Sequence, residues 1–310
     1  MADLSGFGFD GAAGGGNRPE RAQIILVGAF ALAVVFVALA LVMNAAIYTE
    51  NLATRSESAA TADAHAFHRG TTTVAEDAFQ YAHEVNDSDH AGLERNVTQA
   101  LDAYYNVTRT QQAAGGQLAE ATVGSTTRGT NITDDTGTFE GPSEFDRWTL
   151  ASGVTSTRKF QMQIDTLTLP STEEFRVIAG GTSTWYLNVS YDGTEYDIGV
   201  VESGTYTKCD STTLEDISID FSAGTVNGND CAALNLHEVT GSYVLEFDNS
   251  SEVEGEYQVI VNAEETYTSA DLDDPETDPV LYSMEIDLIY WTPELEYQST
   301  IRVAPGEYSD

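Results

Sequence analysis

One stretch near the N-terminus departs from the mixed polar and apolar pattern of the rest of the chain. Residues Ile24 to Met43 are all apolar, and residues 22–49 contain no charged side chain. Twenty helical residues span about 30 Å, the thickness of the hydrocarbon core of a bilayer. A helix also satisfies its own backbone hydrogen bonds in lipid. The pattern therefore predicts a transmembrane helix over residues 22–48, preceded by a Gly-rich polar leader over residues 1–21.

A helical pattern continues behind the apolar stretch, over residues 49–122. Apolar residues recur at alternating steps of four and three, first from Ala60 to Val85 and then from Leu93 to Leu118. This heptad repeat is typical of helices that pack along one face. Between the two repeats lie polar residues that can cap a second helix. We expect a helical stalk, either folded as an antiparallel hairpin or formed by one long helix that self-associates.

The period changes to two in the C-terminal half of the chain. Residues 123–146 are rich in Gly, Thr, Ser and Asp and are predicted to form a linker. Short alternating segments follow, and Asp192-Gly193 is a strong signal for a hairpin turn. The predicted fold class is therefore α+β: a transmembrane helix and helical stalk, followed by an antiparallel β-sandwich-like domain over residues 147–310.

The composition adds an unusual charge. The 310 residues include 50 Asp and Glu but only 13 Lys and Arg, so the formal net charge is −37. Such a charge opposes compaction, and molar salt relieves it because the Debye length falls to about 3 Å. Abundant acid and scarce lysine resemble the proteins of halophilic archaea; an ordinary acidic surface protein is the alternative. The lack of a basic patch excludes nucleic acid as a partner.

Cysteines and glycosylation acceptors indicate which side of the membrane the C-terminal portion faces. Cys209 and Cys231 suggest one disulfide, with two buried thiols as the alternative. Six Asn-x-Ser/Thr acceptors all follow the apolar stretch: Asn86, Asn96, Asn106, Asn131, Asn188 and Asn249. We therefore expect a single-pass glycoprotein of the cell membrane, with lipid as a partner, a cytoplasmic leader and an extracellular C-terminal domain.

The residues at the start of the apolar stretch suggest a cleavage site. Arg21-Ala22-Gln23 places a basic, a small and a polar residue directly before it. This junction resembles the leader junction of archaeal type IV pilin-like proteins. The resemblance implies cleavage between Ala22 and Gln23, and assembly with other pilin-like subunits or with itself. Many pilins carry a glutamate at the fifth position of the mature helix, where this chain has Val27. A plain signal anchor is the alternative.

Candidate sites for chemistry are few. The chain contains none of the common motifs for nucleophilic, zinc-dependent or phosphate-binding enzymes, so we expect no enzymatic activity and no cofactor. The densest group of oxygen ligands suits Ca²⁺ but lacks the spacing and glycine of an EF-hand, and a solvated loop is the alternative. Its members are Asp271, Asp273, Asp274, Glu276 and Asp278.

Taken together, the patterns favour a structural role at the cell surface. We expect a membrane-anchored protein that serves as a pilin-like subunit or as a component of surface attachment. The alternative function is an anchored extracellular binding module that does not polymerise and whose ligand is a glycan or Ca²⁺.

Overall fold

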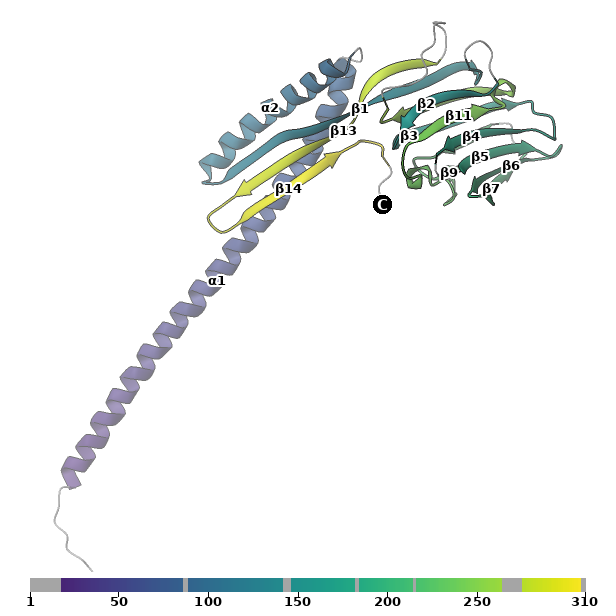
Figure 1. Cartoon of the computed structure of the whole chain (residues 1–310). Coiled ribbons are helices and arrows are strands. Elements are labelled where there is room, and N and C mark those ends of the chain that lie inside the picture. Colours follow the sequence, from purple (N-terminus) through teal and green to yellow (C-terminus); the bar gives the residue numbers. More distant parts are fainter. Residues whose placement is uncertain are drawn as a thin grey trace, which may run out of the picture. The chain divides into compact units, whose positions relative to one another are not determined.

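A computed structural model of the chain describes residues 18–85, 89–141, 146–181, 184–213, 216–263 and 275–307. Figure 1 shows the helices and strands. In chain order these are α1 Arg18–Val85, α2 His90–Ala114, β1 Leu118–Thr138, β2 Trp148–Val154, β3 Thr157–Leu167, β4 Glu174–Gly180, β5 Thr184–Tyr191, β6 Tyr196–Glu202, β7 Thr205–Thr212, β8 Ile217–Asp220, β9 Thr225–Val226, β10 Asn229–Asp230, β11 Tyr243–Asp248, β12 Val253–Val261, β13 Glu276–Trp291 and β14 Glu296–Val303, with the short 3₁₀ helices η1 Leu236–Glu238 and η2 Ser250–Glu252.

The chain forms two compact units, Met1–Thr61 and Ala62–Asp310. Helix α1 runs through the boundary between them and contributes its apolar portion to the first unit. Helix α2 and all the described strands belong to the second unit. The fold class is α+β, as the alternating patterns predict.

Two antiparallel sheets make up the β-structure. One has the strand order β10-β9-β8-β3-β12-β1-β13-β14, and the other has the order β2-β11-β4-β5-β6-β7. Side chains of both sheets meet in one core, where Tyr257 of β12 packs edge-on against Phe247 of β11, and Phe160 of β3 stacks on Phe221. The predicted Asp192-Gly193 turn joins β5 to β6, with Gly193 at φ 96°. The two sheets therefore form a sandwich.

Three strands of the larger sheet extend beyond the sandwich core and carry both helices. This platform consists of the paired segments Leu118–Val123 of β1, Met284–Trp291 of β13 and all of β14. Apolar side chains on one face of the platform, including Ile286 and Leu288, form a second core with α1 and α2. Most residues alternating with them on β13 and β14 are exposed, so the platform has one covered and one open face.

The two helices form an antiparallel hairpin, which is one of the two expected arrangements. Gln117, just after α2, donates a hydrogen bond to Asp63 of α1, and a Cβ at Gly70 would meet the hydroxyl of Tyr104. Asp89 caps α2 by accepting a hydrogen bond from the N–H of Gly92 at 2.7 Å. Beyond Thr61 both helices of the expected stalk pack on the platform. The helical region also ends at Ala114 rather than at residue 122.

The buried face of α1 follows the true period of a helix rather than the heptad read from the sequence. Ala64, Phe67 and Ala78 of the predicted seam are buried, but Tyr81 and Val85 are exposed. The buried residues in this part of the helix include Ala75, Phe79 and Ala82, each one residue after a position of the predicted heptad repeat. A straight helix drifts by about 20° per heptad, so a stripe that faces a sheet changes positions after three turns. Two supercoiled helices would bury the same heptad positions along their whole length, whereas a straight helix on a sheet does not.

The prediction of a linker over residues 123–146 is wrong, because β1 occupies most of that range. It pairs with β12 on one side and with β13 on the other. Thr130, Ile132 and Asp134 face inward and are buried, which is the period-two pattern of a strand. Threonine is β-branched and favours strands. A Cβ at Gly129 would overlap the carbonyl oxygen of Val261, so this glycine permits close strand approach rather than a flexible connection.

A disulfide joins Cys209 and Cys231, the pair expected from the sequence, across Cα atoms 5.2 Å apart. Cys209 lies on β7, the edge strand of the smaller sheet, whereas Cys231 directly follows β10 at the edge of the larger sheet. The amide of Asn227 also donates a hydrogen bond to Asp210, the residue after Cys209. The bond therefore fastens the two sheets together at one open side of the sandwich.

Replacing both cysteines with serine should lower the free energy of unfolding by roughly 3 kcal/mol, because the bond closes a loop of 22 residues in the unfolded chain. Urea unfolding of the full chain, followed by tryptophan fluorescence, measures this difference. The reductant dithiothreitol should shift the midpoint of the natural chain towards that of the double variant and leave the variant unchanged. Equal midpoints for the natural chain and the variant would contradict the prediction.

Candidate functional site

The apolar part of α1 is the most conspicuous surface of the protein. Ile25–Glu50 is a 26-residue helical segment whose most apolar 18-residue stretch has a mean hydropathy of 3.0, so it is long and apolar enough to cross a membrane. Its side chains are exposed along its whole length, and Phe30 and Tyr48 each present about 70% of their surface. A soluble protein rarely exposes a continuous apolar surface of this size. The segment therefore provides a surface for lipid or for the apolar face of another chain.

The predicted cleavage residues lie at the start of the same helix. Arg21, Ala22 and Gln23 fall in the first turns of α1, which begins at Arg18. Their backbone is helical without a break into the apolar segment.

The glycosylation acceptors differ in how accessible they are. Asn106, on the outer side of α2, is exposed, and Asn96 is half-buried. Asn188 is buried in β5, while Asn131 and Asn249 use their side chains in hydrogen bonds with Gln258 and with the carbonyl of Glu174. Asn86 lies outside the described residues. Among the described acceptors, Asn106 is therefore the one that a glycosylating enzyme reaches most readily in the folded protein.

The proposed calcium ligands are only partly described. Asp271, Asp273 and Asp274 lie outside the described residues. Glu276 and Asp278 belong to β13 and stand opposite Thr133 and Asn131 of β1. Among the described residues, no three His, Cys, Asp or Glu side chains are grouped closely enough to hold a metal ion.

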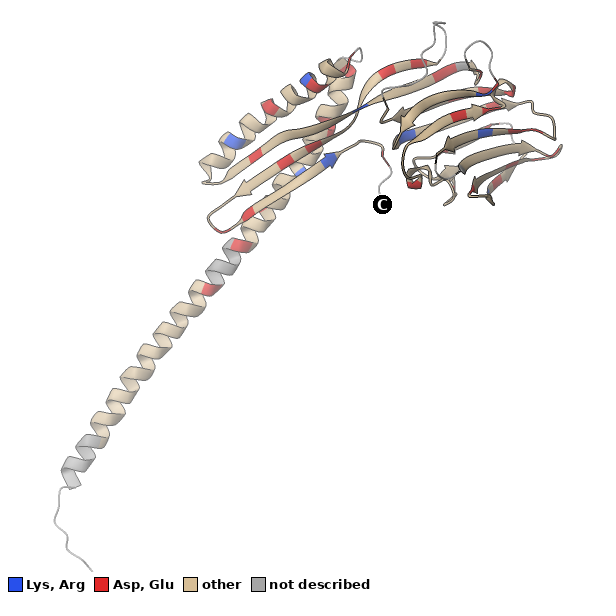
Figure 2. Cartoon of the chain, in the orientation of Figure 1, with Lys and Arg blue, Asp and Glu red and all other residues tan. Residues whose placement is uncertain are grey.

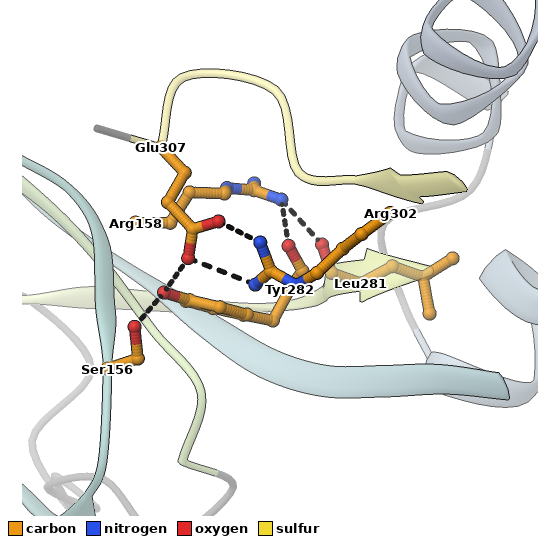
Figure 3. Close-up of polar contacts among 6 residues, drawn as sticks. All are labelled: Ser156, Arg158, Leu281, Tyr282, Arg302 and Glu307. Carbon is orange, nitrogen blue, oxygen red and sulfur yellow. Dashed lines mark hydrogen bonds and ion pairs between the residues drawn. The ribbon is translucent and has the colours of Figure 1, made fainter. Parts of the chain in front are cut away.

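A buried arginine joins strand β3 of the sandwich to helix α1 and to β13, just before β13 enters the platform. Arg158 of β3 is 5% exposed, and its Nη1 donates to the carbonyl oxygens of Leu281 and Tyr282 on β13, each at 2.8 Å (Figure 3). Its guanidinium also lies 5.2 Å from the ring centre of Phe79 on α1 and 5.8 Å from that of Tyr282. Burial lowers the pKa of Arg158 to about 10, so the side chain keeps its charge at neutral pH. This one side chain thus contacts two strands and a helix.

Other polar residues complete this junction cluster, which we define as Ser156, Arg158, Tyr282, Arg302 and Glu307. The hydroxyl of Tyr282 donates to Glu307 at 2.9 Å and lies 2.6 Å from the hydroxyl of Ser156 (Figure 3). Arg302 donates to the same carboxylate. Burial raises the pKa of the Glu307 carboxyl, but the hydrogen bonds from Arg302 and Tyr282 outweigh burial and hold it below its ordinary value. No local sequence pattern marks this cluster.

His83 of α1 is held neutral beside this cluster. Its Nδ1 lies 2.7 Å from the carbonyl of Phe79, and its Nε2 accepts a hydrogen bond from the N–H of Leu281 at 3.1 Å. The ring therefore carries its proton on Nδ1. Burial lowers the pKa of His83 below 6.5, opposed by the bond to Phe79 and assisted by the charge of Arg158. A second proton would sit on Nε2, which would then be a donor facing the N–H of Leu281 and could no longer accept its hydrogen bond.

The second unit should therefore lose stability as the pH falls below 6.5. The unfolded chain takes up a proton on His83 near that pH, whereas the folded protein resists it, so stability is complete above the window and declines below it. The slope from one such group is at most about 1.4 kcal/mol per pH unit. Thermal unfolding between pH 7.5 and pH 5 (about the range in which histidine titrates) measures it. The His83→Gln variant, which keeps an acceptor, should lack this component; an equal slope in both proteins would disprove it.

A polar groove crosses the outer face of the larger sheet. It has a volume of about 890 Å³ and runs over strands β8, β3, β12, β1 and β13. Direct cross-strand pairing sets five side chains abreast on these strands. In strand order this row consists of Asp220, Gln161, Gln258, Thr133 and Glu276. The residues that alternate with the row, such as Met162, Ile219 and Tyr257, are buried in the sandwich core.

The sequence contains only part of the signal for this groove. Gln161 and Gln163 alternate with apolar residues of β3 and so mark a polar outer face. Their partners come from positions 133, 220, 258 and 276, which long-range strand pairing alone brings together. The groove could not be located before the strand order was known.

The comparisons with known proteins cover only part of the chain. Residues 18–154, less than half of the 310, match a family described as a family of unknown function, DUF7261. The matched range contains α1, α2, β1 and β2, but none of β3, β8, β12 and β13, which carry most of the groove. No curated protein and no solved structure matches the chain. The shared part is therefore the apolar helix, the helical hairpin and the first strands of the sandwich.

Proposed function

We propose that the protein is a single-pass surface protein that holds the acidic second unit outside the cell. The observation that carries this proposal is the form of α1. One uninterrupted helix contains the fully exposed apolar segment Ile25–Glu50 and then, from Ala62, the residues that pack on the platform. The same helix that enters lipid is thus part of the folded core of the second unit.

Two features of the second unit support its outward orientation. The Cys209–Cys231 disulfide persists in an oxidising compartment, and the exposed acceptor Asn106 lies on the same side of the apolar segment. A protease added to whole cells tests the orientation. It should remove the second unit and leave only a fragment that ends near the apolar segment. Full protection in intact cells, with digestion after lysis, would place the second unit inside and reject the proposal.

We further propose that the chain is a pilin-like subunit. The support is the Arg21-Ala22-Gln23 junction, followed directly by a helix whose apolar surface is free to pack against neighbouring copies. Removal of residues 1–22 would also remove Arg18 and Arg21, the charges that hold the N-terminus in the cytoplasm. The structural role would then be in a filament or in surface attachment. Val27, where many pilins have glutamate, argues for a minor or modified place in such an assembly.

N-terminal sequencing of the protein extracted from membranes tests the pilin-like proposal. Gln23 is the expected first residue. An Arg21→Ala variant should keep its leader, whereas the matched Arg18→Ala variant should be processed as the natural chain is. An intact leader in the natural chain would refute the pilin-like role and leave a plain membrane anchor.

The acidic composition points to a working solvent of high ionic strength. Figure 2 shows acidic residues on both helices and both sheets, with far fewer basic ones. With 50 carboxylates and 13 basic side chains, most carboxylates cannot have a basic partner. Their mutual repulsion extends over about 10 Å in 0.1 M salt and about 3 Å in 1 M salt.

The melting temperature of the full chain should therefore rise by roughly 10 °C between about 0.1 M and 2 M KCl. Relief of repulsion among carboxylates exceeds the loss of the few exposed ion pairs, such as Arg147 with Glu246. Circular dichroism measures the shift, and sucrose of equal osmolality serves as an uncharged control that should give a smaller one. A melting temperature that is flat or falls with salt would contradict adaptation to brine.

A further inference from the structure

We propose that the groove on the larger sheet binds an uncharged oligosaccharide. The site is independent of the pilin-like role, since it lies on strands outside the apolar helix, and only its β1 residues fall within the matched range. Its volume of about 890 Å³ lies near the upper end for small-molecule sites. Five strands about 4.8 Å apart give the row a length of roughly 19 Å, so the groove suits a chain of several sugar units.

The charge of the groove excludes anionic ligands. Asp220 and Glu276 stand at the two ends of the row, and Glu256 lies beside its centre. A phosphate, sulfate or uronic acid chain would meet these carboxylates in a protein of net charge −37. Asp134 and Asp135 of β1 add two more carboxylates to the lining, and the described residues contain no cluster that could hold a metal ion. The charges therefore oppose an anionic ligand, and the described residues offer no cage for a metal ion; a neutral ligand meets neither obstacle.

The apolar residues of the lining face away from a ligand. Met162, Ile219 and Tyr257 contribute to the lining but are at most 3% exposed, because their side chains belong to the sandwich core. A lipid tail or an apolar peptide would find no hydrophobic contact on this face. Recognition has to come from hydrogen bonds, which favours a ligand with many hydroxyl groups.

The amides of the groove are held in position by their neighbours. Gln161 donates to Asp220 at 2.6 Å; Gln258 accepts from Lys159 at 2.6 Å and donates to Asn131 at 2.9 Å. A sugar hydroxyl both donates and accepts, and a row of fixed amides and carboxylates offers both partners. Groups that are ordered before binding lose less entropy when the ligand arrives. The row is therefore preorganised for hydroxyl groups.

The pair Gln163 and Glu256 provides the sharpest test. These residues stand directly opposite each other on β3 and β12 and line the groove, and no hydrogen bond links their side chains among the described residues. Their polar groups are exposed or half-buried. Truncating both removes contacts to a ligand without disturbing the core. The matched control is Glu296 and Gln298, a carboxylate and an amide on the open face of β14, outside the groove.

The experiment uses the full chain in lipid nanodiscs, because many detergents carry a sugar headgroup. Maltohexaose, cellohexaose, laminarihexaose and mannohexaose are titrated in the presence of EDTA and followed by saturation-transfer NMR, with hexagalacturonate as the anionic probe. At least one neutral hexaose should bind saturably, and hexagalacturonate should not. The Gln163→Ala/Glu256→Ala variant should weaken binding about tenfold or more, and Glu296→Ala/Gln298→Ala should leave it unchanged.

Three results would overturn the proposal: no saturable binding of any neutral hexaose by protein with a native circular dichroism spectrum, equal binding by the groove variant, or equal binding of hexagalacturonate. None of them bears on leader cleavage or membrane anchoring, which the N-terminal sequence and the protease test decide separately.

Discussion

Replacing Arg158 with alanine is expected to lower the free energy of unfolding of the second unit by about 3–4 kcal/mol. The change leaves the carbonyl oxygens of Leu281 and Tyr282 without their donor in a site that is 5% exposed. It also leaves a void beside the rings of Phe79 and Tyr282. Each hydrogen bond to a charged donor contributes about 1.5–3 kcal/mol, so the two bonds alone account for the expected loss. Urea unfolding monitored by circular dichroism measures it.

Arg302→Ala is the matched control within the same cluster. Arg302 pairs with Glu307 but is half exposed, and exposed ion pairs contribute about 0–1 kcal/mol. Arg158→Met retains the volume without the hydrogen bonds and should fall between the two, which separates the void from the unpaired carbonyls. If Arg158→Ala were no more destabilising than Arg302→Ala, the buried arginine would not be what joins β3 to β13 and α1.

Much of the fold could be predicted from local patterns in the sequence. The apolar segment, the two helices and the alternating strands each repeat with the period of their own structure, and Asp192-Gly193 fixes its turn by backbone chemistry. The pairing of Cys209 with Cys231 follows from there being two cysteines. These features depend only on residues close together in the chain or, for the disulfide, on the number of cysteines.

The errors arose where tertiary packing decides the structure. Residues 123–146 have the composition of a linker, but a threonine-rich segment becomes a central strand once β12 and β13 cover its two edges. The sequence of α1 predicts a heptad repeat, but a sheet rather than a second supercoiled helix covers the helix, so Phe79 is buried and Tyr81 is exposed. The composition and period of a segment can predict whether it is a helix or a strand, but which of its faces is buried depends on the element that packs against it.

The junction cluster and the groove were beyond sequence reasoning for a further reason. Arg158 lies between Thr157 and Lys159 and resembles any polar residue of a strand, and only the structure shows that β13 and α1 enclose it. The groove combines residues from positions 133 to 276 through pairings of four strand pairs. None of its residues stands out in the sequence, and the strand order of the sheet is what places them side by side.

Gly255 provides the second large effect, because it forms the irregular step of β12 from which the groove residue Glu256 projects. The register between β12 and β3 shifts at Glu254 and Gly255, and Gly255 has φ 157°. A Cβ there would overlap the backbone carbonyl oxygen of Gln163, which cannot move aside as a flexible side chain could. Gly255→Ala should therefore lower the free energy of unfolding by about 3 kcal/mol or more. Thermal and urea unfolding measure the loss.

The structure supplies a close control for this prediction. Gly137 of β1 is the direct cross-strand partner of Gly255, yet a Cβ at Gly137 would meet nothing within 4 Å. Gly137→Ala should change stability by less than about 1 kcal/mol, in either direction. Equal losses of stability for Gly255→Ala and Gly137→Ala would mean that the loss comes from replacing a strand glycine in general and not from the overlap with Gln163. A large effect at Gly255 alone would show that the irregular step is required, and with it the position of Gln163 and Glu256 in the groove.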